Sequence, residues 1–252
     1  MKILVLGDIH GRVIWKDIIE KEVPDLTIFL GDYVSSHDKI VANLQLQNLK
    51  EILNFKESNK DKVILLRGNH DLQHLGYSWA ECSGFNKNVF QEMMKPKFRE
   101  RFLKDSQWVF RIENIIFSHA GISQNWFDHC NFKSIEDINK EEPSLLFGFS
   151  SADPFDYCGD SISQPLTWIR PASLCVSAVK GYKYVVGHTP VVEILDILGY
   201  LKGKLLERGQ EKEVAKLYDE NGEIWLCDSL PKQYLIIQDN EFIVRNYTPL
   251  VE

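Results

Sequence analysis

The 252-residue sequence lacks the features that mark secreted, membrane-spanning or duplex-binding proteins. Its five cysteines are scattered and form no Cys-x-x-Cys pair, so neither a disulfide framework nor a structural zinc site is expected. No apolar run approaches transmembrane length, and the start of the chain shows no signal peptide. Basic residues are outnumbered, 29 against 36 acids, which excludes the basic face of a general duplex-DNA or anionic-membrane binder. We therefore expect a cytoplasmic protein that binds neither duplex nucleic acid nor membranes.

The composition is that of a globular protein with a sizeable core. Hydrophobic residues make up 44% of the chain, an ordinary share for a folded domain. The length fits one large α/β domain, and no repeat or low-complexity segment divides it. We predict a single domain over residues 1–252, with a loop-rich lid or binding wall within residues 120–180.

Short apolar runs alternate with helical patterns in the first third of the chain. We expect buried strands at residues 3–6, 26–30 and 63–66, with amphipathic helices at residues 12–23 and 40–55 between them. This order implies parallel pairing of the strands, joined by right-handed crossovers.

The remaining sequence is less regular. Residues 72–107 look mainly helical with an interruption near Pro96, and residues 108–118 read as a hairpin. A further strand is expected at residues 184–187, and the charged stretch at 202–220 is a solvated helix or surface excursion. The chain closes with three predicted antiparallel strands, at residues 224–227, 234–237 and 242–245.

Five polar clusters each follow a predicted strand. They are Gly7-Asp8-Ile9-His10-Gly11, Gly31-Asp32-Tyr33, Gly68-Asn69-His70-Asp71, Ser118-His119-Ala120-Gly121 and Gly187-His188-Thr189-Pro190. Ligands of open α/β sheets collect at the carboxyl ends of strands, so these side chains should converge. Oxygen and imidazole donors without thiolate suit Mn²⁺, Fe or Zn²⁺ in an open catalytic site. Asp32, at the end of the second strand, is best placed to bridge two cations.

These motifs resemble those of the calcineurin-like metallophosphoesterases, in the branch of Ser/Thr protein phosphatases and bacterial diadenosine tetraphosphatases. The resemblance rests on GDIHG at 7–11, GDYV at 31–34, LLRGNHD at 65–71, SHAG at 118–121 and VVGHTP at 185–190. Five motifs in family order and at family separations are a specific match, which extends over residues 7–190. The resemblance implies an α/β fold, an αββα sandwich of two mixed β-sheets flanked by helices, with metals at its rim.

The same resemblance implies a role for each motif residue. The implied metal ligands are Asp8 and His10 for one ion, Asp32 for both ions, and Asn69, His119 and His188 for the second. His70 would protonate the leaving oxygen or stabilise the departing group. Arg170 resembles an arginine that grips phosphate between the fourth and fifth motifs.

Our working hypothesis for the chemistry follows from that ligand set. Two divalent transition metal ions, Mn²⁺ first and Fe or Zn²⁺ as alternatives, would lie about 3.5–4 Å apart and share a water whose pKa they lower. The resulting hydroxide attacks phosphorus in line, while the metals, Asn69 and Arg170 neutralise charge on the phosphate oxygens. His70 acts opposite the attacking face.

The second motif departs from the family pattern GDYVDRG at Ser35 and Ser36. The replaced Asp normally orients the histidine that matches His70, and the replaced Arg normally grips phosphate. The diadenosine tetraphosphatases also lack that Asp but keep the Arg. Asp38 and Asp71 are candidates to take over the role of the Asp.

We predict a metallophosphoesterase, a phosphoric ester hydrolase that acts on phosphomonoesters in the manner of a Ser/Thr protein phosphatase. One alternative keeps the chemistry but takes diadenosine tetraphosphate or another nucleotide as the substrate. An alternative of another class is a catalytically silent interaction scaffold on the same fold, although a scaffold has no need of six converging donors. The expected partner is a phosphorylated protein or small phosphoester. Three histidines outside the motifs, His37, His74 and His129, are expected to be surface or packing residues.

Overall fold

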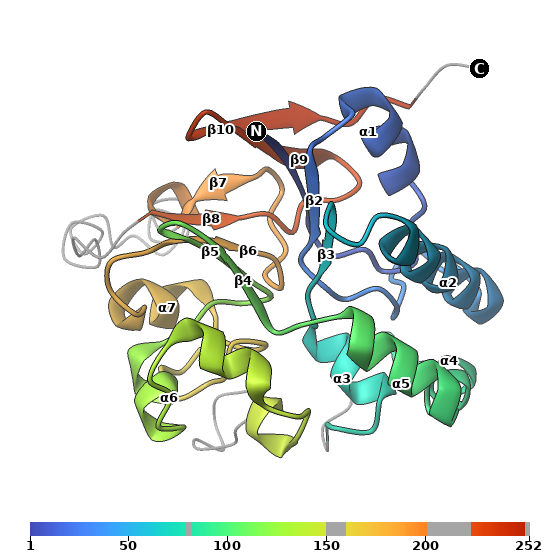
Figure 1. The fold of residues 1–252 in the computed structure, drawn as a ribbon, viewed down its shortest axis with the longest axis horizontal. Coiled ribbons are helices and arrows are strands. Elements are labelled where there is room, and N and C mark those ends of the chain that lie inside the picture. The colour runs from blue at the N-terminus through green and yellow to red at the C-terminus, as the bar shows by residue number, and fades with distance from the viewer. Residues whose placement is uncertain (79–81, 150–159, 201–222, 250–252) are drawn as a thin grey trace.

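The computed structural model describes residues 1–78, 82–149, 160–200 and 223–249. These residues form two five-stranded sheets with helices on their outer faces (Figure 1). The predicted α/β sandwich of two mixed sheets flanked by helices is confirmed. The whole charged stretch at 202–220 and part of the predicted lid at 120–180 lie outside the described residues. Within them, no helix has the length and apolar character needed to cross a membrane.

The first sheet contains the parallel strands predicted from the apolar runs. Its order is β10-β9-β1-β2-β3, with bounds β1 (Lys2–Leu6), β2 (Leu26–Phe29), β3 (Val63–Leu65), β9 (Gln233–Gln238) and β10 (Glu241–Asn246). β1, β2 and β3 run parallel, joined by α1 (Trp15–Glu22) and α2 (Ala42–Ser58). β9 pairs antiparallel with both β1 and β10, so the two C-terminal strands complete the sheet that the first residues begin.

The second sheet has the order β4-β5-β6-β8-β7. Its strands are β4 (Val109–Ile112), β5 (Ile115–Ser118), β6 (Lys183–Val186), β7 (Leu195–Asp196) and β8 (Ile224–Leu226). The predicted hairpin is β4 and β5, which pair antiparallel. The prediction that residues 224–227 close the chain in one antiparallel group with the last two strands was wrong, because β8 lies in this sheet, parallel to β6 and antiparallel to β7. A short apolar run specifies burial but not the direction of its neighbours, so the sequence could not decide this.

The helices cover the outer faces of the two sheets. α3 (Asn69–His74), α4 (Lys87–Met93) and α5 (Pro96–Asp105) occupy the region predicted to be mainly helical. Pro96 begins α5, at the first helical turn, where proline costs no hydrogen bond. The second sheet is covered by α6 (Gln124–His129), α7 (Pro171–Ser177) and the 3₁₀ turns η1 (Ile135–Lys140) and η2 (Leu145–Phe147).

Three apolar layers hold this arrangement together. Along β1 the side chains alternate, so that Leu4 and Leu6 pack against the helices while Ile3 and Val5 face the second sheet. The layer between the sheets includes Phe117 from the second sheet. Helices α6 and α7 pack onto the outer face of that sheet. The strand ends of both sheets are therefore fixed relative to one another by packing.

Candidate metal centre

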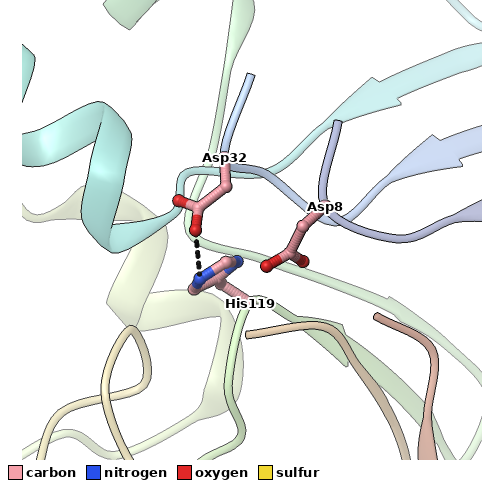
Figure 2. A group of neighbouring side chains, drawn as sticks. All are labelled: Asp8, Asp32 and His119. Atoms are coloured by element: carbon pink, nitrogen blue, oxygen red, sulfur yellow. Dashed lines mark ion pairs between the residues drawn. The ribbon is translucent and has the colours of Figure 1, made fainter. Parts of the chain in front are cut away.

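Three donor side chains from both sheets meet at one edge of the sandwich (Figure 2). Asp8 follows β1, Asp32 follows β2, and His119 follows β5. One ligand atom from each lies within 4.8 Å of the others, and all three residues are buried. His119 Nε2 and Asp32 Oδ2 lie 3.4 Å apart. The strand-end positions predicted that these side chains would meet. The structure brings them together although Asp8 and His119 are 111 positions apart in the chain.

Asn69 extends this cluster toward the fifth motif. Its side-chain Oδ1 lies 2.9 Å from His119 Nε2 and 3.0 Å from His188 Nδ1. The opposite end of the amide is held as well, because Asn69 Nδ2 donates to Cys82 Sγ at 3.3 Å. The structure therefore brings Asn69, His119 and His188 to one point, with the amide oxygen directed at the two imidazoles.

The backbone directs the histidine nitrogens into the cluster. His119 Nδ1 lies 2.9 Å from Leu30 O, and His10 Nδ1 lies 2.9 Å from Val34 O. A carbonyl oxygen can only accept, so Nδ1 carries a proton in both rings, and Nε2 is the nitrogen turned toward the cluster.

Three of the predicted ligands adopt the left-handed backbone region, with φ of 46° at His10, 50° at Asp32 and 62° at His188. This region costs a residue other than glycine about 1–2 kcal/mol. Strained backbone of this kind concentrates at functional sites, where the surrounding structure holds it in place.

Two motif glycines make room for carboxylates that come from other motifs. A Cβ atom on Gly187 would lie 2.2 Å from Asp8 Oδ1, and a Cβ atom on Gly68 would lie 2.1 Å from Asp32 Oδ1. Real Cβ atoms essentially never approach another atom more closely than 3.0 Å. Gly68 of the third motif is thus required by Asp32 of the second, and Gly187 of the fifth motif is required by Asp8 of the first.

A sequence model of the family described as calcineurin-like phosphoesterase matches residues 1–224. The chain belongs to the calcineurin-like phosphoesterase family. It is accordingly a metal-dependent phosphoesterase, a phosphoric ester hydrolase.

Solved structures show the same fold at low sequence identity. The phosphoesterase superposes on the cold-active protein-tyrosine phosphatase of a psychrophilic Shewanella species with a TM-score of 0.62, at 16% identity over 96% of this chain and 77% of that one. A Saccharomyces cerevisiae protein serine/threonine phosphatase with similarity to human phosphatase PP5 gives 0.55, at 12% identity over 100% and 81% of the two chains. A metallophosphoesterase from Sphaerobacter thermophilus gives 0.51, at 11% identity over 98% and 88%.

The electrostatics of the phosphoesterase's cluster fit a bound cation. Burial raises the pKa of Asp8 well above its ordinary value, and the nearby Asp228 raises it further. Burial likewise raises the pKa of Asp228 to about 6, with a further contribution from Asp32. Burial alone would lower the pKa of His119, but the nearby carboxylates of Asp32 and Asp8 outweigh burial and raise this pKa to about 10. Several buried carboxylates thus share a single protonated imidazole, and divalent cations among these oxygen and nitrogen donors would supply the missing positive charge.

His70 lies beside the cluster without the acceptor that the family pattern provides. Its Nε2 is 3.8 Å from Asp32 Oδ2, whereas its Nδ1 is buried and has no hydrogen-bond partner among the described residues. Neither suggested substitute for the missing Asp reaches it. Asp71 accepts hydrogen bonds from the backbone N–H groups of Asp32, Tyr33 and Gly68. Asp38 pairs with Arg12 at 2.6 Å.

Arg170 is placed next to the fifth motif. Its Nη1 donates to the backbone oxygen of His188 at 3.1 Å and to Thr189 Oγ1 at 3.2 Å. The side chain is half-buried, and the residue caps the N-terminus of α7. The guanidinium is therefore fixed beside one of the predicted metal ligands, as an arginine that binds phosphate requires.

Sequence reasoning missed two residues at this site. Asp228 directly follows β8, the same strand-end signal that identified the other clusters, and its carboxylate is buried near Asp8. His37 is exposed, as expected of a surface residue, but its contact with the site was missed: its ring lies against His10 and His70, with centroids 4.9 and 6.0 Å away. His74 fits its expected packing role, because it is buried and stacked on Phe85.

Proposed function

We propose that this phosphoesterase hydrolyses phosphomonoesters, with phosphorylated serine and threonine side chains as the substrate class and two Mn²⁺ ions as the metal pair. The observation that carries the proposal is the meeting of Asp8, Asp32 and His119 within 4.8 Å, at an edge to which Asn69 and His188 are also directed. When bound, two divalent cations lower the pKa of a shared water and stabilise charge on the phosphoryl oxygens.

The proposed ligands divide between two ions. Asp8 and His10 would hold one ion, Asp32 would serve both, and Asn69, His119 and His188 would hold the other. The position of Asp32 supports a bridging role, because its ligand atom lies within 4.8 Å of those of Asp8, assigned to one ion, and His119, assigned to the other.

Three side chains are proposed to act on the substrate itself. Arg170, fixed against His188, binds a phosphoryl oxygen by hydrogen bonds from its guanidinium. Asn69, which follows β3, contacts the same phosphoryl group. His70, beside Asp32, stabilises the departing oxygen. The serines at positions 35 and 36 place no guanidinium in the second motif, so Arg170 carries the main cationic contact from the protein.

A second candidate substrate is diadenosine tetraphosphate or a related nucleotide. It is favoured by one observation, that Ser35 replaces the acidic residue which the diadenosine tetraphosphatases also lack. We further infer one domain over residues 1–252, supported by the pairing of the C-terminal strand β9 with the N-terminal strand β1.

Hydrolysis of three substrates by the Mn²⁺-loaded protein tests the proposal. A phosphoserine peptide, p-nitrophenyl phosphate and diadenosine tetraphosphate separate the substrate classes. Asp32→Asn should lower kcat by about 100-fold or more, because it removes the charge that both ions would share. Asp61→Asn, an exposed acid before β3, is the matched control and should leave kcat unchanged. Hydrolysis that survives a chelator, or full activity of Asp32→Asn, would contradict the proposed chemistry.

A further inference from the structure

The loop that follows the second motif is held in one shape by contacts with its neighbours. Ser36 Oγ accepts hydrogen bonds from the backbone N–H groups of Asp38 at 3.1 Å and Ile40 at 3.4 Å. Gln45 on α2 receives the Ser36 N–H and donates to Ile40 O at 2.6 Å. Arg12 fixes the far end through its 2.6 Å ion pair with Asp38. The position of His37, in the middle of this loop, is therefore determined by the fold.

That position places the His37 ring among the histidines of the metal centre. Its centroid is 4.9 Å from that of His10 at an interplanar angle of 72°, and 6.0 Å from that of His70 at 88°. His10 and His70 are themselves 5.1 Å apart, so the three imidazoles form a triangle of edge-to-face contacts. His37 is exposed, whereas His10 and His70 are only 6% and 8% exposed. His37 thus forms the solvent-facing corner of the triangle.

His37 lies outside the group formed by Asp8, Asp32 and His119, whose ligand atoms all lie within 4.8 Å of one another. His70, which is proposed to stabilise the departing oxygen, lies 3.8 Å from Asp32, and the exposed His37 ring lies against the His70 ring. The alcohol portion of an ester whose departing oxygen lies at His70 would therefore lie beside His37.

We propose that His37 is a substrate-contacting residue, whose imidazole contacts the alcohol portion of the phosphate ester. This inference rests on the proposed function, and it deepens that function by naming the residue that recognises the organic group. An imidazole offers both an N–H donor and an apolar ring face for this purpose. The family pattern has an acidic and a basic side chain where this chain has Ser35 and Ser36. The side chain that this loop places beside His10 and His70 is instead the imidazole of His37.

The test compares esters with inorganic phosphate, which has the phosphoryl oxygens but no alcohol group. In the Mn²⁺-loaded protein, His37→Ala should lower kcat/KM for p-nitrophenyl phosphate and for a phosphoserine peptide by about tenfold, the loss expected for one hydrogen bond. The Kd of inorganic phosphate, measured by calorimetry, should change by less than about twofold, since phosphate makes no contact with His37. His37→Gln should recover part of the loss because it keeps an N–H donor. His129→Ala, an exposed histidine on α6, is the matched control and should behave as wild type.

The possible failures are distinguishable. Unchanged kcat/KM in His37→Ala, with an active wild-type protein, overturns the inference and leaves the proposed function standing. A parallel weakening of phosphate binding, or a fall in Mn²⁺ content, also overturns it, because either result places the effect of His37 at the phosphoryl group or the metals. A wild-type protein that hydrolyses no ester overturns the proposed function, and this inference with it.

Discussion

Replacing Gly187 with alanine adds one atom, the alanine Cβ, which would press on one carboxylate oxygen of the metal centre. The added Cβ would lie 2.2 Å from Asp8 Oδ1, and the next nearest atom, Asp8 Cγ, is already at an ordinary 3.4 Å. The backbone at Gly187 is not in the left-handed region, so alanine can adopt it without strain. The substitution therefore acts on the position of one carboxylate and on little else.

The size of the effect follows from that geometry. To restore the 3.0 Å limit, the Asp8 carboxylate must retreat by roughly 0.8 Å, the difference between the two distances. It would then lose the hydrogen bonds that it accepts from the His188 backbone N–H, now 3.0 and 3.1 Å long. Metal–ligand distances in proteins keep to within about 0.2 Å, and a displacement of about 1 Å at a reacting centre costs about 100-fold in rate. We expect a loss of about 100-fold in kcat/KM and weaker binding of one metal ion.

The assay measures Mn²⁺ content by elemental analysis and hydrolysis of p-nitrophenyl phosphate on the same samples. Gly199→Ala is the matched control, because its Cβ would meet the side-chain ends of Leu195, at 3.2 Å, and Asp196, at 3.3 Å, both outside the site. Cooperative thermal unfolding of both variants establishes that the fold is intact. If Gly187→Ala keeps the metal content and about the wild-type kcat/KM, the assignment of Asp8 as a ligand is refuted.

Three further outcomes are expected from groups away from the metal centre. Asn48→Ala should lower the free energy of unfolding by about 1–3 kcal/mol in a urea titration without changing kcat, because it leaves the buried Trp15 N–H, now bonded at 2.9 Å, without an acceptor. Partial burial would raise the pKa of Glu22, but the hydrogen bond from Lys2 outweighs it and holds the pKa below the ordinary 4.5. Glu22→Gln should therefore reduce stability above the ordinary glutamate pKa, and its unfolding free energy should converge on that of wild type as the pH falls through the lowered value. Burial raises the pKa of the Cys130 thiol to about 11, so iodoacetamide at neutral pH should label it, by mass spectrometry, much more slowly in the folded than in the unfolded protein.

Much of the fold was predictable because the central strands are buried on both faces. Residues 3–6, 26–30 and 63–66 are continuous apolar runs, and the structure contains parallel strands there, with only small shifts at their ends. Direction was not predictable for β8. Its three residues, Ile224–Leu226, fit equally well beside a parallel or an antiparallel neighbour, and the pairing with β6 is set by distant parts of the chain.

The same distinction explains the outcome for the site. Motif residues that directly follow a strand inherit their position from the sheet, and the structure brings Asp8, Asp32 and His119 together as expected. Asp228 obeys the same rule but was overlooked, because β8 was assigned to a terminal antiparallel group. His37 was not predictable, since its position depends on the contacts of a loop with Arg12 and α2, which no local pattern encodes.

The donors are divided between the halves of the sandwich, with Asp8, Asp32 and Asn69 borne by the first sheet and His119 and His188 by the second. An ion bound by donors from both groups would link the two sheets, so its binding free energy would add to the free energy of unfolding. At a free metal concentration about 100 times the Kd, this linkage is worth about 2.7 kcal/mol. The melting temperature should therefore rise with added Mn²⁺. The supply of metal in the cell would then set the lifetime of the folded enzyme as well as its turnover rate.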